Sequence, residues 1–228
     1  MNLQNHYANL HKSALATINK EGFSQDSEID NPNDLRRGLT LLLRPNVTIR
    51  QAFDTFIQKV KQVDPDQYFY PPSDIHVTLM PVISCYTGLT MEKLDLGKYD
   101  RYIQNALKGV GNIGLRFEGV FASPACLIIK GYPLNEQLDR LRQQLRTVFS
   151  RSDVEQSLDK RYKLITAHSS VVRFRKPTKV PDRILELLAL FESYDFGQQY
   201  FDEVELVYND WYQRQSLVKT IYTYPLSM

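Results

Sequence analysis

Apolar residues recur along the chain with two periods, one typical of helices and one typical of strands. Spacings of three and four residues, which bring apolar side chains to one face of a helix, occur in five segments. These segments lie at residues 1–20, 46–60, 99–107, 133–148 and 181–191. Asn46 or Thr48 is expected to cap the second helix, and Pro181 stands at the start of the last one, where proline is favoured.

Short apolar runs and alternating segments predict the strands. In residues 113–121, Ile113, Leu115 and Phe117 alternate with polar or small residues, which is the period of a half-buried strand. The last two strands are expected to form a hairpin around residues 209–214. The predicted strands lie at residues 39–45, 75–83, 113–121, 126–132, 162–174, 200–208 and 215–224.

The order strand–helix–strand occurs twice, and each time the second strand carries a histidine. The first unit opens at Leu39 and reaches His76 after 37 residues, and the second opens at Cys126 and reaches His168 after 42 residues. A further helix and the strand at residues 113–121 are expected to complete the first half. This repetition predicts an α+β domain of two similar lobes that face each other, with mostly antiparallel sheets.

A polar loop at residues 21–34 separates the first helix from this repeated pattern. We therefore expect residues 1–35 to form an N-terminal helical extension and loop, and residues 36–228 to form the bilobal domain. With 228 residues, 43% of them hydrophobic, the chain is long enough to bury a core in one large domain or two small ones.

Charge and cysteine content narrow the classes of function. The net charge of +2 is too small to predict an extended surface for a polyanion, so phosphate binding depends on locally placed Arg and Lys. Cys85 and Cys126 lack metal-ligand spacing and are too few for a disulfide scaffold, which indicates a reducing compartment. The chain begins without a secretory signal and contains no apolar run of about 20 residues, so we expect a soluble, cytoplasmic protein that has no membrane partner.

The two histidine strands share the pattern H-x-[ST]. Side chains two residues apart on a strand point to the same face, about 7 Å apart along the backbone. His76 and Thr78 therefore project together, as do His168 and Ser170, and Arg173 follows three residues after Ser170. If the two lobes face each other, two imidazoles and two hydroxyls converge on one cleft.

These side chains suit phosphoryl transfer by general acid–base catalysis. One neutral imidazole accepts a proton from water or an alcohol, while a second, protonated imidazole donates a proton to the leaving oxygen. Hydroxyl groups and a guanidinium stabilise the charge that grows on the non-bridging oxygens. Neither histidine is accompanied by an H-E-x-x-H motif or a carboxylate cluster, so we expect no metal ion and no other cofactor.

Taken alone, H-x-[ST] is a weak motif, and a strand histidine is more often a hydrogen-bonded structural residue. The chain contains a third match, at His11, Lys12 and Ser13, in the N-terminal helical segment. Residues i and i+2 do not face each other on a helix, so we attribute this match to chance. Two copies at corresponding places in two similar units favour the functional interpretation of His76 and His168.

The segments HVTLMP and HSSVVR, about ninety residues apart, resemble the two signature motifs of the 2H phosphoesterase superfamily. The hairpin IGLRFEGVFASPACLIIKGY is similar to the segment between those motifs, and Arg173 matches the arginine that often follows the second one. The resemblance covers roughly residues 37–225. It implies a bilobal α+β fold with helices outside and a central cleft, catalysis without a metal, and action on 2′,3′-cyclic phosphates, 2′–5′ oligonucleotides or small cyclic phosphates.

Three features depart from the pattern of the superfamily. Ser170 stands where threonine is commoner, although the hydroxyl is retained. The first 35 residues have no counterpart in the shortest bacterial members, and Arg44 adds a cation after the first strand. The last two departures leave the identity of the substrate open, but they do not affect the chemistry expected of the two motifs.

The candidate site residues follow from the motifs and from the resemblance. The expected catalytic residues are His76, His168, Thr78 and Ser170. His168 is assigned as general base and His76 as general acid, with the reverse order left open. The expected substrate-binding residues are Arg173, Tyr70, Tyr132 and Arg44. The aromatic rings among them either stack on bases or only cover the edge of the core.

Together these observations predict a cytoplasmic, monomeric phosphodiesterase that acts on an RNA end or on a small cyclic or oligonucleotide substrate. Three alternatives remain: 2′–5′ RNA ligation at the same site, hydrolysis of a cyclic oligonucleotide, and nucleotide or RNA binding without catalysis. Binding alone does not require two imidazoles, which favours an enzyme.

Overall fold

The computed structural model describes residues 2–160 and 163–226, and its helices lie close to the five predicted segments. Within these ranges the α-helices are α1 (Leu3–Glu21), α2 (Val47–Val63), α3 (Leu96–Leu107), α4 (Gln137–Phe149) and α5 (Pro181–Leu190). Asn46 caps α2, since its side chain accepts a hydrogen bond from the backbone N–H of Ile49. The helix expected from Pro133 begins later, because Pro133 still pairs with Leu115 in a strand. None of these helices combines the length and apolar character that a membrane span requires.

The strands form two sheets, and all pairings in the described ranges are antiparallel. The strands are β1 (Arg36–Leu43), β2 (Tyr68–Phe69), β3 (Val77–Thr87), β4 (Ile113–Ser123), β5 (Cys126–Pro133), β6 (Ala167–Arg173), β7 (Asp195–Phe201), β8 (Glu203–Asp210) and β9 (Lys219–Pro225). One sheet has the order β3-β1-β8-β9 and the other the order β2-β6-β5-β4-β7. The predicted α+β class is thereby confirmed. Tyr162, the predicted start of the second histidine strand, lies outside the described residues.

The sheets do not divide the chain into a first and a second half, which corrects the predicted assignment of strands to the lobes. β4, expected to complete the first half, pairs with β5 and β7, while the C-terminal strands β8 and β9 extend the sheet from β1. A tight turn joins β4 to β5, with Ser123 opposite Cys126, so the pairing of sequence neighbours determines the sheet of β4. Each histidine strand still pairs with the strand that opens its unit, β3 with β1 and β6 with β5.

The C-terminal part of the chain crosses from one sheet to the other at Asp202. The hydrophobic pattern predicted one strand over residues 200–208, but the structure has β7 before Asp202 and β8 after it. β7 pairs with β4, and β8 pairs with β1. A single residue therefore joins the edge of one sheet to the middle of the other, and apolar alternation does not reveal such a change of partner.

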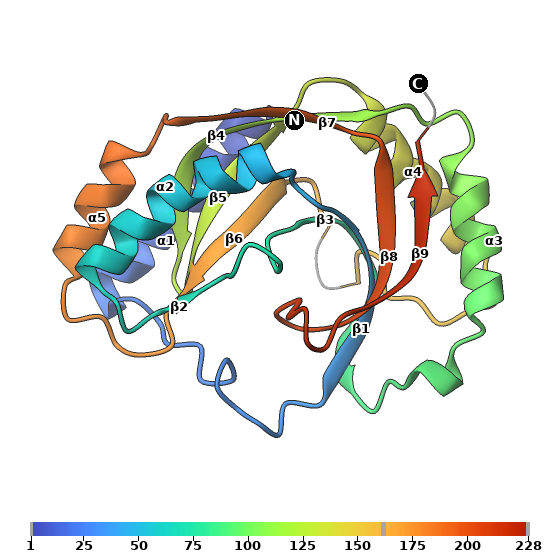
Figure 1. The fold of residues 1–228 in the computed structure, drawn as a ribbon, viewed down its shortest axis with the longest axis horizontal. Coiled ribbons are helices and arrows are strands. Elements are labelled where there is room, and N and C mark those ends of the chain that lie inside the picture. Colours follow the sequence, from blue (N-terminus) through green and yellow to red (C-terminus); the bar gives the residue numbers. More distant parts are fainter. Residues whose placement is uncertain (1, 161–162, 227–228) are drawn as a thin grey trace.

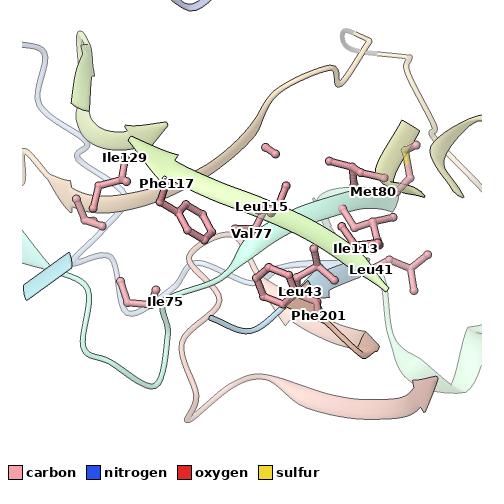
Figure 2. Close-up of a cluster of buried hydrophobic side chains, with 14 of the residues drawn as sticks. Leu41, Leu43, Ile75, Val77, Met80, Ile113, Leu115, Phe117, Ile129 and Phe201 are labelled. Carbon is pink, nitrogen blue, oxygen red and sulfur yellow. The ribbon is translucent and has the colours of Figure 1, made fainter. Parts of the chain in front are cut away.

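A large apolar core fills the space between the two sheets and helices α2 to α5. Figure 1 shows α2 and α5 at one end of the molecule and α3 and α4 at the other, with strands between them. Figure 2 shows Leu41 and Val77 of the four-stranded sheet in one buried cluster with Leu115, Phe117 and Ile129 of the five-stranded sheet. Because the two sheets share this core, they hold β3 and β6 next to each other.

Helix α1 packs on the five-stranded sheet through a second, smaller apolar cluster. Tyr7 of α1 contacts Phe121 of β4, and Ile128 of β5 belongs to the same cluster. Ile128 lies opposite Ser170 in the register of β5 and β6, and directly opposite side chains share a face. The N-terminal helix therefore covers part of the sheet face that carries His168 and Ser170.

Candidate active site

A cavity of about 190 Å³ lies where β3 and β6 come together. Both H-x-[ST] pairs line it, and Arg173 and Tyr70 line it as well, so six of the eight predicted site residues surround one cavity. The other lining residues are Thr40, Pro81, Ile83, Ser84, Cys85, Ser157, Asp159, Leu164, Asn209, Trp211 and Gln213. Among the described residues, no three or more His, Cys, Asp or Glu side chains are arranged to hold a metal ion.

His76 lies immediately before β3, whereas the sequence placed it within the strand. Its neighbours Ile75 and Val77 are buried in the core, and the imidazole between them faces the cavity. The Nδ1 atom lies 2.7 Å from the backbone carbonyl oxygen of Asp74. Because a carbonyl oxygen only accepts hydrogen bonds, Nδ1 carries a proton, and Nε2 is the nitrogen that gains and loses one.

His168 lies within β6, and its Nδ1 atom is 2.8 Å from the hydroxyl oxygen of Thr166. A hydroxyl can donate or accept, so this contact orients the ring without determining which nitrogen carries the proton. Ser169 is fully buried on the opposite side of the strand, while His168 and Ser170 line the cavity. Each imidazole is thus held by the residue two positions before it, one by a backbone carbonyl and the other by a side-chain hydroxyl.

A β-bulge brings Arg173 to the same face as Ser170. In an unbroken strand, residues three positions apart point to opposite faces. The register of β5 and β6 shifts between Leu127 and Ile128, which leaves Val171 as an extra residue in β6. Arg173 therefore lines the cavity, although the strand period alone would turn it away.

Hydrogen bonds and an ion pair hold the Arg173 guanidinium in place. Its Nε donates to the Tyr70 hydroxyl at 2.8 Å, and its Nη1 lies 3.0 Å from Oδ2 of Asp26. The other carboxylate oxygen of Asp26 accepts a 2.8 Å hydrogen bond from the Tyr212 hydroxyl, whose ring lies 5.3 Å from the guanidinium. Burial raises the pKa of Tyr70, so this hydroxyl stays protonated. Since Tyr70 is only 4% exposed, it supports Arg173 and offers no open ring face for a base.

Burial lowers the pKa of both cavity histidines to about 4. For His76, the Asp74 carbonyl opposes this effect, while nearby positive charges add to it. For His168, the charges of Arg142 and Arg173 lower the pKa further. Both rings are therefore neutral near pH 7 in the free protein, and a bound anion would raise both pKa values by offsetting the positive charges.

Among the described residues, Arg44 and Tyr132 are predicted site residues that do not line the cavity. Arg44 forms a 3.2 Å ion pair with Glu205, and its charge lowers the pKa of His76 from outside the cavity. Tyr132 packs under α1, with its ring centre 5.4 Å from that of Tyr7. Gly131 pairs with Ala167, the first residue of β6. Tyr132 comes after Gly131, so it lies beyond the end of β6. The structure does not support the substrate contact predicted for Tyr132.

Two charged residues that the sequence did not single out support the site. Asp26, in the loop after α1, holds Arg173 across 147 residues of sequence, and a polar loop carries no signal for such a pair. Arg142, on α4, is 1% exposed and donates to carbonyl oxygens beside both motifs. It lies four residues after Leu138 on the buried face of its helix. An arginine on the apolar face of a helix is a sequence signal for a buried charge, but the regular spacing of the leucines made this face look purely apolar.

Comparisons with known proteins show similarity at the level of the fold. No protein-family model matches the chain, and a search of curated proteins finds no match. The structure is similar to TT0787 of Thermus thermophilus, with a TM-score of 0.58 and 15% identity over 83% of this chain and 97% of that one. It is similar to E. coli LigT complexed with 3′-AMP, with a TM-score of 0.55 and 12% identity over 85% and 99% of the two chains. It is also similar to a phosphoesterase, with a TM-score of 0.54 and 13% identity over 85% and 99%.

The matched proteins are covered almost completely, so the likeness is one of whole folds. At these identities it shows how the chain folds and leaves its reaction to be argued from the cavity. The chain has the fold of LigT and of the phosphoesterase, which confirms the fold predicted from the resemblance to the 2H phosphoesterase superfamily.

Proposed function

We propose that the chain is a phosphodiesterase of the 2H phosphoesterase type, which hydrolyses a 2′,3′-cyclic phosphate or a 2′–5′ phosphodiester of RNA or a nucleotide. One observation carries the proposal: His76 and His168, from separate motifs, line a single cavity with Thr78, Ser170 and Arg173. The fold shared with a phosphoesterase and with LigT, whose structure was determined with 3′-AMP, supports the same class of reaction.

In the proposed reaction, His168 is the general base and His76 is the general acid. Neutral His168 accepts a proton from a water molecule, whose oxygen bonds to phosphorus as the bond from phosphorus to the ribose oxygen breaks. His76, protonated on both nitrogens, donates its Nε2 proton to that leaving oxygen. Each turnover adds a proton to His168 and removes one from His76, and exchange with solvent restores both rings.

The contacts of the two rings favour this assignment over the reverse. The Asp74 carbonyl accepts a hydrogen bond from Nδ1 of His76 and so favours its protonated form, although burial and nearby positive charges hold its pKa at about 4, as for His168. For His168, burial and the charges of Arg142 and Arg173 all lower the pKa. The Thr166 hydroxyl does not require a proton on Nδ1 of His168, so this ring can remain neutral and accept a proton.

Thr78, Ser170 and Arg173 are proposed to bind the phosphate. One hydroxyl from each motif donates to a non-bridging oxygen, and the guanidinium balances the charge that grows there in the transition state. The cavity volume of about 190 Å³ is below the roughly 300–1,000 Å³ of most small-molecule sites. We therefore expect the phosphate and ribose to lie inside the cavity and the base to lie at its opening.

The test measures hydrolysis of adenosine 2′,3′-cyclic phosphate and of a 2′–5′ linked adenylate dimer by the wild type, His76→Ala and His168→Ala. Each substitution should lower kcat by about 10²–10⁴-fold, the usual contribution of a positioned acid or base. His11→Ala is the matched control, because His11 belongs to the third H-x-S match, on α1, and does not line the cavity. A rate near that of the wild type in either cavity variant, or nucleotide binding without turnover by the wild type, would overturn the proposal.

A further inference from the structure

Apart from the side chains that line the cavity, one buried charge contacts both histidine motifs. Arg142, on α4, is 1% exposed and is the largest fully buried side chain in the described part of the chain. Leu138, Leu141 and Leu145 on the same helix are fully buried too, so the guanidinium lies inside the protein. Its hydrogen bonds go to backbone carbonyls rather than to a carboxylate.

These hydrogen bonds join the two motifs. On β3, Nε of Arg142 donates to the carbonyl oxygen of Leu79 at 2.9 Å, and Nη2 donates to that of Thr78 at 3.2 Å. Nη2 also donates to the carbonyl oxygen of Thr166, just before β6, at 2.8 Å. Thr78 lines the cavity, and the Thr166 hydroxyl contacts Nδ1 of His168. One side chain is therefore bonded to both halves of the site.

The position of Arg142 explains why an arginine is suited to this contact. β3 and β6 belong to different sheets, so no strand pairing in the described ranges sets the distance between them. The planar guanidinium presents several donors in fixed directions and holds three carbonyls at set positions, which a flexible ammonium group cannot do. Burying a charge is costly, and here the cost is only partly offset, because Nη1 of Arg142 is buried without a hydrogen-bond partner. The retention of this charge therefore points to a role beyond packing.

We propose that Arg142 is a positioning residue that sets the spacing of His76 and His168 across the cavity by bonding both motifs. This inference rests on the proposed function and adds to it a residue outside the H-x-[ST] motifs. Arg142 does not line the cavity, so it acts through Thr78 and Thr166 and does not touch the substrate.

The charge of Arg142 provides a readout that a purely structural residue would lack. Its positive charge lowers the pKa of His168, so its removal should raise that pKa. The other titratable or charged groups that share the cavity with His168 are His76, Tyr70, Cys85, Asp159 and Arg173. None of these groups is substituted in the Arg142 variants.

The kinetic test compares Arg142→Lys and Arg142→Met with Arg140→Met in the full chain, using adenosine 2′,3′-cyclic phosphate as substrate and rates per folded molecule. Lysine keeps the charge but cannot hold three carbonyls, so Arg142→Lys should lower kcat by about 10–100-fold, the cost of a small misplacement, and change KM by less than about threefold. Arg140 is exposed on the same helix, so Arg140→Met removes one positive charge and should keep the wild-type rate.

Titration of the imidazole signals by NMR supplies the second readout. Arg142→Met should raise the pKa of His168 above its wild-type value, and Arg142→Lys should leave it near that value. A wild-type kcat in Arg142→Lys, or an unchanged His168 pKa in Arg142→Met, would overturn the inference. If Arg142→Met does not fold, the kinetics of Arg142→Lys decide alone. A wild type that hydrolyses no cyclic phosphate would overturn the proposed function instead, and the His168 titration would still test the contact with Arg142.

Discussion

Each of the two cavity histidines is contacted by the residue two positions before it in the sequence, but the contacting groups differ. Nδ1 of His76 contacts the backbone carbonyl of Asp74, and Nδ1 of His168 contacts the hydroxyl of Thr166. A carbonyl only accepts, so the first ring keeps its Nδ1 proton in both protonation states, while a hydroxyl adapts to either state of the second ring. Two motifs that look alike in the sequence therefore provide two rings with different proton chemistry.

The electrostatic surroundings of the two rings are otherwise similar. Burial lowers both pKa values to about 4, but for His76 the carbonyl of Asp74 opposes the effect. Positive charges reinforce the effect of burial on both rings, those of Arg44 and Arg173 for His76 and those of Arg142 and Arg173 for His168. The different hydrogen-bond partners of the two Nδ1 atoms are therefore the physical basis for the proposed assignment of His76 as general acid and His168 as general base.

The largest effect beyond the histidines themselves is expected from the hydroxyl of each motif. Thr78→Val and Ser170→Ala each remove one hydroxyl that we propose binds the phosphate, and each should lower kcat/KM by about 10²–10³-fold, as is typical for a donor to a transition-state oxygen. Thr78→Ser keeps the hydroxyl and should retain most of the activity. Steady-state kinetics with a cyclic nucleotide measure these values. Losses below about threefold in both hydroxyl-free variants would show that the motifs do not hold the phosphate.

A second expected effect concerns stability at acidic pH. Both cavity histidines have a pKa of about 4 in the folded protein, against about 6.5 in an unfolded chain. Between pH 4 and pH 6.5 the unfolded chain binds more protons than the folded protein. The contribution of the neutral histidines to the free energy of unfolding is therefore complete above pH 6.5 and is lost as the pH falls towards 4. The loss in the free energy of unfolding should be of the order of 3 kcal/mol for each ring.

Urea unfolding between pH 7.5 and pH 4 measures this contribution. The comparison is between the wild type and the double variant His76→Asn, His168→Asn, which lacks both titrating rings. The stability of the double variant should fall less steeply with pH. Parallel curves for the two proteins would contradict the lowered pKa values.

The smallest effect on kcat is expected from loss of the contact between the Thr166 hydroxyl and Nδ1 of His168. Thr166→Val removes the hydroxyl on Nδ1 of His168 while keeping the shape of the side chain, and one lost hydrogen bond of this kind corresponds to roughly a three- to tenfold decrease in kcat. Thr166→Ser should restore the rate. A wild-type rate in Thr166→Val would show that orientation of His168 does not depend on this hydroxyl.

Local rules predicted the five helices, most of the strands and the face of β6 that carries its motif. The period of two places His168 and Ser170 on one face of β6, and the structure has both at the cavity. Helical spacing predicted the buried face of α2 and, for α4, the three buried leucines Leu138, Leu141 and Leu145, whereas Leu134 lies before α4 and is exposed. Such predictions hold because they depend only on residues a few positions apart.

The remaining features depend on contacts between distant segments. Arg173 reaches the cavity through a bulge that arises from the pairing of β6 with β5, and its carboxylate partner Asp26 comes from a loop near the N-terminus. Arg142 contacts both motifs only because the tertiary fold brings α4 within hydrogen-bond distance of the carbonyl oxygens of Leu79 and Thr166. The partners of β4 likewise depend on the hairpin with β5 and not on the order of the two halves. None of these pairings is encoded in local periodicity.

The central claim is that the imidazoles of His76 and His168 act on the same phosphorus atom. Groups that act as a unit show losses that do not multiply when both are removed. The direct measurement is kcat for adenosine 2′,3′-cyclic phosphate in His76→Ala, His168→Ala and the double variant. We predict a loss of about 10²–10⁴-fold in each single variant and little further loss in the double variant. A wild-type rate in either single variant, or a double loss equal to the product of the two single losses, would contradict the claim.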